Sequence, residues 1–266
     1  MPSPKAIREK LNDPAYPVEV LETASSTNTL LKERAMAGEQ AGTVLIALEQ
    51  TAGRGRRGRS FLSAPGKGLY MSMLLRPGLP AEKLMPLTGL AAVAAAEAAE
   101  KVSKAAVGVK WVNDLILNGK KLGGILTELG VTPGDKTPWA VIGIGVNLAF
   151  TKEDFRGAGL EDIATSFSAE GLTAEADDLA AALIRAFLSA EAALRAGDIS
   201  RYLNAYRGRC VTLNKPVKIL YPSGAREGTA LDIDEGFSLR VLRTDDHTED
   251  TVFSGEVSVR GFYGYI

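Results

Sequence analysis

The chain has very few of the residues that build disulfides and metal clusters: one cysteine and one histidine in 266 residues. Cys210 cannot form an intrachain disulfide on its own, which is typical of proteins from a reducing cytoplasm. His247 stands in an acidic stretch, whereas a zinc site needs about three protein ligands, usually with several His or Cys among them. We therefore expect no metal held by protein ligands, and a surface turn around His247.

The sequence also lacks long apolar runs and an excess of either charge. Its longest apolar stretch, residues 90–99, is mostly alanine, is interrupted by Glu97 and falls short of the ~20 residues that a membrane span requires. The first 17 residues contain no apolar run, so we expect no signal peptide, no membrane anchor and a cytoplasmic location. A formal net charge of -1 argues against broad electrostatic binding to nucleic acid or membranes.

What the sequence does contain is a local concentration of cations, the arginine loop (residues 53–59, GRGRRGR), with four arginines within six residues. Like charges in contact repel by roughly 1 kcal/mol even in water, so such a cluster favours a bound anion. Glycine lets the backbone approach that anion closely, and arginine supplies planar paired donors for phosphate or carboxylate. The segment also matches GxGxxG, but the sequence after it predicts a loop and a strand, which argues against a dinucleotide-binding fold.

Apolar patterning predicts a mixed α/β domain followed by a small all-β domain. The expected strands of the first domain are residues 17–21, 43–49, 69–76, 107–112, 122–129 and 140–146. The expected helices are residues 27–36, 84–102, 174–195 and 199–206. Beyond Arg209, short strands are expected at residues 211–213, 217–221, 228–234, 238–242, 251–253 and 256–259.

Local signals add detail to this outline. Residues 26–28 (STN) offer hydroxyl and amide caps at the start of the first predicted helix. Asn118 and Gly119 separate two apolar segments, which strongly indicates a β-hairpin. Residues 152–163 are polar and contain glycine, so we expect a loop there.

Three further segments carry polar groups at strand ends: residues 110–114 (KWVND), 121–128 (KLGGILTE) and 143–147 (GIGVN). Taken singly, each is compatible with an edge-strand lysine, a bulge glycine or a capping asparagine. Together with the arginine loop, residues 26–28 and Gln50, they predict one site for phosphate and amide groups.

Six segments, STN, EQTAGRGRRGRSF, KWVNDL, KKLGGILTE, GIGVN and GEVSVR, follow one another from about residue 20 to residue 260. In this order they resemble the biotin–protein ligase family (biotin–[acetyl-CoA-carboxylase] ligase). The resemblance implies an α/β catalytic domain with a mixed sheet, like class II aminoacyl-tRNA synthetases, over residues 1–209. It implies an SH3-like β-barrel over residues 210–266.

The resemblance also implies a role for individual residues. Those expected to bind biotin are Ser26, Thr27, Gln50, Gly53, Arg54, Arg56 and Gly124. Those expected to bind ATP or the adenylate are Arg57, Arg59, Phe61, Lys110, Asn113, Lys121, Asn147 and Arg260. The expected catalytic residues are Lys121, Arg57, Arg59 and Asp114. Phe61 stands where the family commonly has Trp, and Val112 where it commonly has Pro.

The implied activity is ATP-dependent activation of biotin as biotinyl-5′-AMP, followed by transfer to a lysine of a carboxylase biotin-carrier domain. Mg²⁺ is expected to bind mainly through the phosphates of ATP. About 17 residues precede the implied catalytic domain, so we expect no helix-turn-helix and no specific DNA binding; a homodimer is compatible with the family. The alternatives are a lipoate or octanoate ligase or transferase of the same fold, and a nucleic-acid-binding module.

Overall fold

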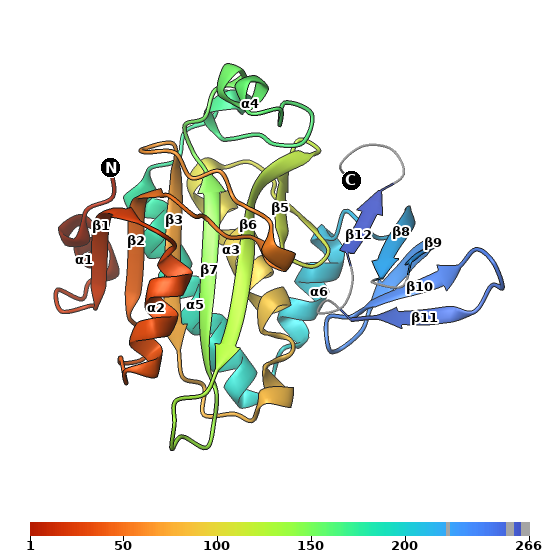
Figure 1. Cartoon of the computed structure of the whole chain (residues 1–266), viewed down its shortest axis with the longest axis horizontal. Coiled ribbons are helices and arrows are strands. Elements are labelled where there is room, and N and C mark those ends of the chain that lie inside the picture. The colour runs from red at the N-terminus through yellow and green to blue at the C-terminus, as the bar shows by residue number, and fades with distance from the viewer. Residues whose placement is uncertain (222–223, 254–257, 262–266) are drawn as a thin grey trace.

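The structure is a computed structural model that describes residues 1–221, 224–253 and 258–261, the last segment by its backbone alone (Figure 1). Its centre is a seven-stranded sheet in the order β1-β2-β3-β7-β6-β5-β4. The strands β1 and β2 are parallel and all other neighbours are antiparallel, which confirms an α/β fold with a mixed sheet. The strands are β1 (Val18–Ala24), β2 (Val44–Gln50), β3 (Gly68–Leu75), β4 (Gly108–Lys110), β5 (Asp114–Leu117), β6 (Lys120–Gly130) and β7 (Trp139–Asn147).

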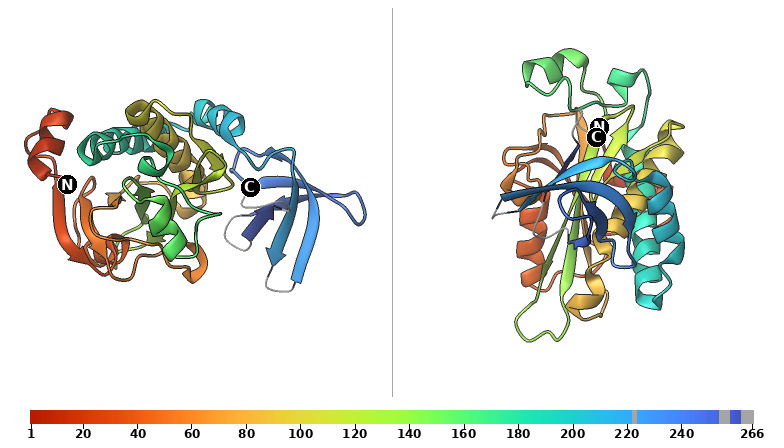
Figure 2. Two further views of the ribbon diagram at one scale, coloured as in Figure 1. Left: turned by 90° about the horizontal axis from the view of Figure 1, so that it is seen from above. Right: turned by 90° about the vertical axis from the view of Figure 1, so that its right-hand side faces the viewer.

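Helices cover both faces of this sheet. Helices α3 and α5 pack against each other and against one face, while α2 contacts β3 and β7 from the other face (Figures 1 and 2). The alanine-rich stretch at residues 90–99 is the centre of α3 and is almost entirely buried. The helices are α1 (Pro4–Leu11), α2 (Thr27–Met36), α3 (Leu87–Ser103), α4 (Lys152–Gly157), α5 (Ala176–Ala196) and α6 (Ser200–Arg209).

A second, five-stranded antiparallel sheet follows α6, in the order β11-β10-β9-β8-β12. Its buried residues, among them Val217, Ile219 and Phe237, belong to the same apolar core as the large sheet. Within the described residues β11 and β12 are its two edges, so closure into a barrel stays a prediction, as does a domain boundary at Arg209. The strands are β8 (Pro216–Tyr221), β9 (Gly224–Ile233), β10 (Leu239–Arg243), β11 (Glu249–Val252) and β12 (Ser258–Gly261).

Most predicted elements are confirmed. The expected hairpin joins β5 to β6, and Asn118 and Gly119 both have positive φ, 49° and 80°, as a type I′ turn requires. His247 is exposed, in a turn between β10 and β11. In the part of the chain that the structure describes, no helix is both long and apolar enough to span a bilayer.

Four local predictions need correction. The loop expected at residues 152–163 contains α4, whose capping box pairs Thr151 with Asp154. The strand expected at residues 107–112 ends at Lys110, because the chain turns before β5. Residues 211–213 form a turn instead of a strand, since the backbone passes directly from α6 to the second sheet. Helix α1 was not predicted, although Ser3 caps it.

The strand expected at residues 256–259 falls partly outside the described residues. Its last two positions, 258 and 259, lie in β12, and residues 256 and 257 are not described.

Candidate active site

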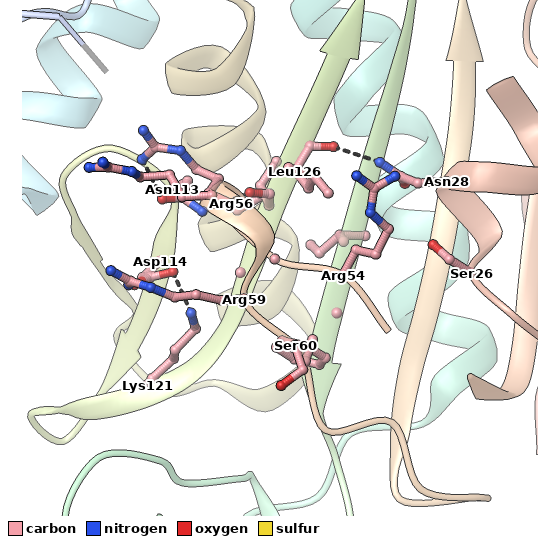
Figure 3. Close-up of a pocket in the computed structure, with 18 of the residues that line it drawn as sticks. Ser26, Asn28, Arg54, Arg56, Arg59, Ser60, Asn113, Asp114, Lys121 and Leu126 are labelled. Atoms are coloured by element: carbon pink, nitrogen blue, oxygen red, sulfur yellow. Dashed lines mark hydrogen bonds and ion pairs between the residues drawn. The ribbon is translucent and has the colours of Figure 1, made fainter. Parts of the chain in front are cut away.

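A pocket opens on the face of the large sheet that carries α2 (Figure 3). The start of α2, the arginine loop, the turn between β4 and β5, and strands β6 and β7 all contribute side chains to it. Ser26, Asn28 and Arg54 lie at one end of the view in Figure 3, and Asn113, Asp114 and Lys121 lie at the other. The pocket therefore has two ends with different chemistry.

The first end is built around Gln50, the last residue of β2. Its Oε1 accepts hydrogen bonds from the backbone N and the Oγ1 of Thr27, at 2.9 and 3.2 Å, and its Nε2 donates to Ser63 Oγ at 3.1 Å. Ser26 occupies the N-cap position of α2 but makes no capping hydrogen bond with its side chain. The prediction that Ser26 caps α2 is therefore wrong. The side chain of Gln50, on β2, accepts the hydrogen bond from the N-terminus of this helix instead.

A buried polar chain continues from Thr27 beneath this end of the pocket. Ser72 Oγ lies 2.7 Å from Thr27 Oγ1 and 2.6 Å from Asn28 Oδ1. Asn28 Nδ2 donates to Leu126 O at 3.1 Å and to Glu128 Oε2 at 3.0 Å. Because each buried polar group has a partner, this end is held in one arrangement.

Glu128 is the last residue of this polar chain, and two positively charged side chains lie beside it. Lys32 Nζ lies 2.6 Å from its Oε1 and Arg54 Nη1 lies 3.6 Å from it. Burial opposes ionisation of Glu128, but hydrogen bonds from Lys32 and Asn28 and the charge of Arg54 outweigh it and lower its pKa. Glu128 thus anchors the first arginine of the arginine loop to β6.

We expect Glu128→Gln to lower the free energy of unfolding by about 1–2 kcal/mol at pH 7, since it removes charge-assisted hydrogen bonds. A carboxylate with a lowered pKa stabilises the fold above its unfolded pKa, and that contribution is lost as the pH falls through the folded pKa. Urea unfolding at neutral pH and below about pH 4 should therefore show the gap between parent and variant closing in acid. A gap that is the same at both pH values would contradict this.

Glu97→Gln is the matched control for that measurement. Glu97 pairs with Arg201 at 2.8 Å on the surface, where the Arg201 side chain is 65% exposed. Exposed pairs of this kind contribute little, so its effect should be much smaller than that of Glu128→Gln at pH 7.

The other end of the pocket carries an ion pair in which Lys121 Nζ lies 2.6 Å from Asp114 Oδ1 (Figure 3). The backbone of Lys121 is held from the other side, because its N–H donates to Ile163 O and its carbonyl accepts from Thr165 N. Asn113 Nδ2 donates to Ile125 O at 2.8 Å. These contacts fix the carboxylate on β5, the ammonium on β6 and the amide in the turn that precedes β5.

The arginine loop lies over the pocket and contacts three parts of the protein. Besides the Arg54–Glu128 pair, Arg56 Nη1 donates to Asn113 Oδ1 at 3.1 Å, and Arg57 Nη1 donates to Leu220 O of β8 at 3.4 Å. Burial lowers the pKa of Arg56, and the charge of Asp114 acts against that shift; the guanidinium remains charged at neutral pH. The loop therefore has partners inside the protein that the sequence alone did not reveal.

Most of the predicted site residues line this one pocket. They are Ser26, Thr27, Gln50, Arg54, Arg56, Arg57, Arg59, Phe61, Lys110, Asn113, Asp114, Lys121 and Gly124. Phe61 packs over Gly145, where an added Cβ would overlap its ring.

Three predicted residues are placed differently. Gly53 is not among the lining residues; a Cβ there would lie 2.5 Å from Phe61 O, so the backbone needs a glycine at this point. Asn147 is buried and donates to Thr165 O at 2.9 Å, which directs its amide away from the pocket lining. Arg260 lies on β12 opposite Lys218, and its side chain is outside the described residues.

Asn28 and Trp111 also line the pocket, and both belong to segments predicted to form the site, residues 26–28 and 110–114; Met71 lines it from outside those segments. Met71 reaches the pocket from β3, and no local pattern predicts that this strand lies between β2 and β7.

The charge of the lining is strongly one-sided. Six of its side chains are cationic (Arg54, Arg56, Arg57, Arg59, Lys110 and Lys121), and Asp114 is the one carboxylate among its described residues. No group of three His, Cys, Asp or Glu side chains suitable for a metal occurs among residues 1–221, 224–253 and 258–261. The lining therefore suits a polyanion, and a metal ion here would need most of its ligands from that anion.

The fold and the pocket together define a small-molecule site that combines amide and hydroxyl groups at one end with a cationic end suited to phosphate or carboxylate. Residues 20–147 match the model of the biotin/lipoate A/B protein ligase family. The chain is also 33% identical over 244 residues to the bifunctional ligase/repressor BirA of Escherichia coli, covering 91% of this chain and 74% of that protein. The chain belongs to the biotin/lipoate A/B protein ligase family.

Two further relatives extend the comparison. A bifunctional ligase/repressor BirA of Bacillus spizizenii is 43% identical over 144 residues, which are 54% of this chain and 44% of that protein; the aligned part spans less than half the length of that relative. The biotin protein ligase of Aquifex aeolicus, solved in complex with biotin and ATP, superposes with a TM-score of 0.75 at 26% identity. The match covers 92% of this chain and 98% of that one.

Proposed function

We propose that this chain is an ATP-dependent biotin–protein ligase, which forms biotinyl-5′-AMP and transfers biotin to a lysine of a carboxylase biotin-carrier domain. The observation that carries the proposal is the two-ended pocket, with Gln50 and Thr27 at one end and the Lys121–Asp114 pair beneath the arginine loop at the other. Its relatives in the family include ligases of this kind, one of them solved with biotin and ATP. The amide and hydroxyl end suits the ureido ring of biotin, and the cationic end suits a carboxylate beside a triphosphate.

In the first step an oxygen of the biotin carboxylate attacks the α-phosphorus of ATP, and pyrophosphate leaves. Two anions must approach each other for this to happen. Lys121, Arg57 and Arg59 lower that repulsion and stabilise the charge that develops at the phosphorus. The pairing of Lys121 with Asp114 holds the ammonium in place before the substrates arrive.

In the second step the amine of the acceptor lysine attacks the carbonyl carbon of the mixed anhydride, and AMP leaves. The attacking amine must lose a proton, and Asp114 is the one carboxylate among the described lining residues that is placed to orient the ammonium or accept the proton. The arginine loop above the pocket excludes water, which would otherwise hydrolyse the anhydride.

Mg²⁺ fits this site as a companion of ATP, held mainly by phosphate oxygens, because the described lining offers a single carboxylate. It would add positive charge at the leaving pyrophosphate. We further propose that the second sheet belongs to an SH3-like barrel over residues 210–266. A homodimer, a cytoplasmic location and the absence of specific DNA binding stay predictions.

Mass spectrometry of an apo biotin-carrier domain tests the proposed function. After incubation with the chain, ATP, Mg²⁺ and biotin, the carrier should gain one biotinyl group on one lysine. Lipoate and octanoate, offered with their own acceptor domain, serve as the competing substrates. A chain that modifies the lipoyl domain and leaves the biotin-carrier domain unchanged would overturn the proposal.

We expect ligands to protect the segment from Gly53 to Gly68 against trypsin. Its five glycines favour local opening in the free protein, whereas an anionic adenylate would neutralise the arginines and offset an ordering cost of roughly 1–2 kcal/mol per residue. Cleavage at the basic residues should be fast in the free protein, slow with biotin plus ATP, and unchanged with ATP alone. Equal rates with and without both ligands would show that the segment does not close over the site. The candidate cleavage sites are Arg54, Arg56, Arg57, Arg59 and Lys67.

A further inference from the structure

The turn between β9 and β10 of the second sheet reaches into the large domain through Phe237. Phe237 has a positive φ of 61°, which is unusual for a bulky residue. The side chain of Asp234 supports the turn, since its Oδ1 accepts from Gly236 N and Ser238 N at 2.9 and 2.7 Å. The turn is thus built to present one aromatic residue, of which only 2% is exposed.

The ring of Phe237 occupies a notch in the large domain. It lies perpendicular to the ring of Tyr206 on α6 in a T-shaped contact, with centroids 5.2 Å apart. On α3 the ring lies so close to Gly89 that a Cβ there would overlap it. Gly89 is the third residue of α3, and its position is too close to the Phe237 ring for a larger side chain.

The backbone of Phe237 makes a second contact, and this one leads to the pocket. Its carbonyl accepts a hydrogen bond from Trp111 Nε1 at 2.9 Å, and Trp111 N donates to Thr212 Oγ1 at 3.0 Å. Trp111 is buried and lines the pocket next to Lys110, in the turn that also presents Asn113. Both N–H groups of Trp111 are therefore held by residues that follow α6.

The second sheet is also fixed to α6, so it can act as a support. Arg207 donates to Ile233 O at 3.0 Å and forms an ion pair with Asp232 at 2.9 Å, both on β9. Val211 N donates to Val109 O of β4 at 2.9 Å. Strand β4, which precedes Trp111, is thus hydrogen-bonded to the segment that connects the two sheets.

We infer that Phe237 is a positioning residue of the second sheet: it sets the place of Trp111, and thereby of the nucleotide end of the pocket. The packing of the Phe237 ring against Gly89 fixes the position of the Phe237 carbonyl. That carbonyl in turn fixes the position of the Trp111 indole N–H. At the other end of the pocket, Gln50 and Thr27 bond to each other, to Ser63 and to Ser72. This end, proposed to bind the ureido ring, should therefore be insensitive to Phe237. The inference rests on the proposed function in assigning the nucleotide to the Lys110–Asn113 end.

The test uses a matched pair of helical glycines. Gly89→Ala pushes on the Phe237 ring without changing any pocket residue, whereas Gly208→Ala on α6 adds a methyl group with nothing within 4 Å. In an assay of biotin-dependent pyrophosphate release, Gly89→Ala should raise the KM for ATP about tenfold and leave the KM for biotin within about twofold. Gly208→Ala should leave both at the parent values. A purely structural defect would instead lower the active fraction and leave both KM values unchanged.

Fluorescence supplies a readout that does not depend on ligase activity. Trp111 and Trp139 are the two tryptophans of the chain, so in a Trp139→Phe background the emission reports on Trp111 alone. Gly89→Ala should shift that emission, and Gly208→Ala should not. If the parent protein has no biotin-dependent activity, the proposed function is refuted. The change in Trp111 emission caused by Gly89→Ala would still test the contact between Phe237 and Trp111.

Two milder variants keep the inference testable if Gly89→Ala fails to fold. Phe237→Leu shrinks the ring, and Trp111→Phe removes the indole donor but keeps an aromatic side chain. Each should raise the KM for ATP and spare the KM for biotin. Equal rises in both KM values, or none in any folded variant, would overturn the inference.

Discussion

Replacing Lys121 with alanine is expected to slow the formation of biotinyl-5′-AMP about 10²–10³-fold, the usual effect of removing one group that stabilises transition-state charge. Affinity for biotin should change little, because Lys121 lies with Asp114 at the far end of the pocket from Ser26 and Asn28 (Figure 3). Pyrophosphate release measures the first quantity and calorimetry with biotin measures the second.

Lys120→Ala is the neighbouring control. Lys120 precedes Lys121 on β6, but its Nζ donates to Glu161 O at 2.6 Å on the exposed side. It should therefore release pyrophosphate at the parent rate. A Lys121→Ala protein that does the same would remove Lys121 from the chemistry.

Replacing Gly143 with alanine should destabilise the protein by about 3 kcal/mol and weaken biotin binding. A Cβ at this position of β7 would overlap the side-chain amide of Asn28. That amide bonds Ser72, Leu126 and Glu128, so displacing it leaves buried polar groups without partners. The midpoint of urea unfolding and the KM for biotin report the two effects.

Gly157→Ala provides the comparison, because nothing lies within 4 Å of the added methyl group on α4. It should unfold at the same urea concentration as the parent. If Gly143→Ala also matches the parent in its midpoint and in its KM for biotin, the polar chain from Thr27 to Glu128 does not shape the pocket.

Elements with strong local patterns could be predicted from the sequence. Strands β2, β3 and β7 are nearly continuous apolar runs, and Asn118-Gly119 marks the hairpin between β5 and β6 by its backbone preference alone. The order of the strands could not be predicted, because β3 pairs with β7 across an intervening helix and three strands.

The errors in helix prediction have a local cause. Thr151 and Asp154 form a capping box at the start of α4, but the polar and glycine-containing composition of residues 152–163 hid it. At the start of α2 the local sequence instead suggested a cap that does not form. Ser26 has the residue type of a cap, yet the acceptor comes from Gln50, 23 residues beyond the Thr27 that it bonds.

The site shows the same division between local and distant signals. The arginine loop and the Lys121 segment were visible because their residue types are concentrated in a few positions. The distant partners of the arginine loop were not visible: Asn113 lies 57 residues from Arg56, and Leu220 lies 163 residues from Arg57. Asn147 was expected to bind the adenylate from the end of its strand, but in the fold its amide donates to Thr165 O.

The exchange of labelled pyrophosphate into ATP tests the account most directly, because it reports formation of the acyl-adenylate with no carrier protein present. The account predicts that label enters ATP only when biotin is added, and that Lys121→Ala abolishes most of this exchange. Exchange supported by lipoate or octanoate and not by biotin would contradict it, as would the absence of any biotin-dependent exchange by the folded parent protein.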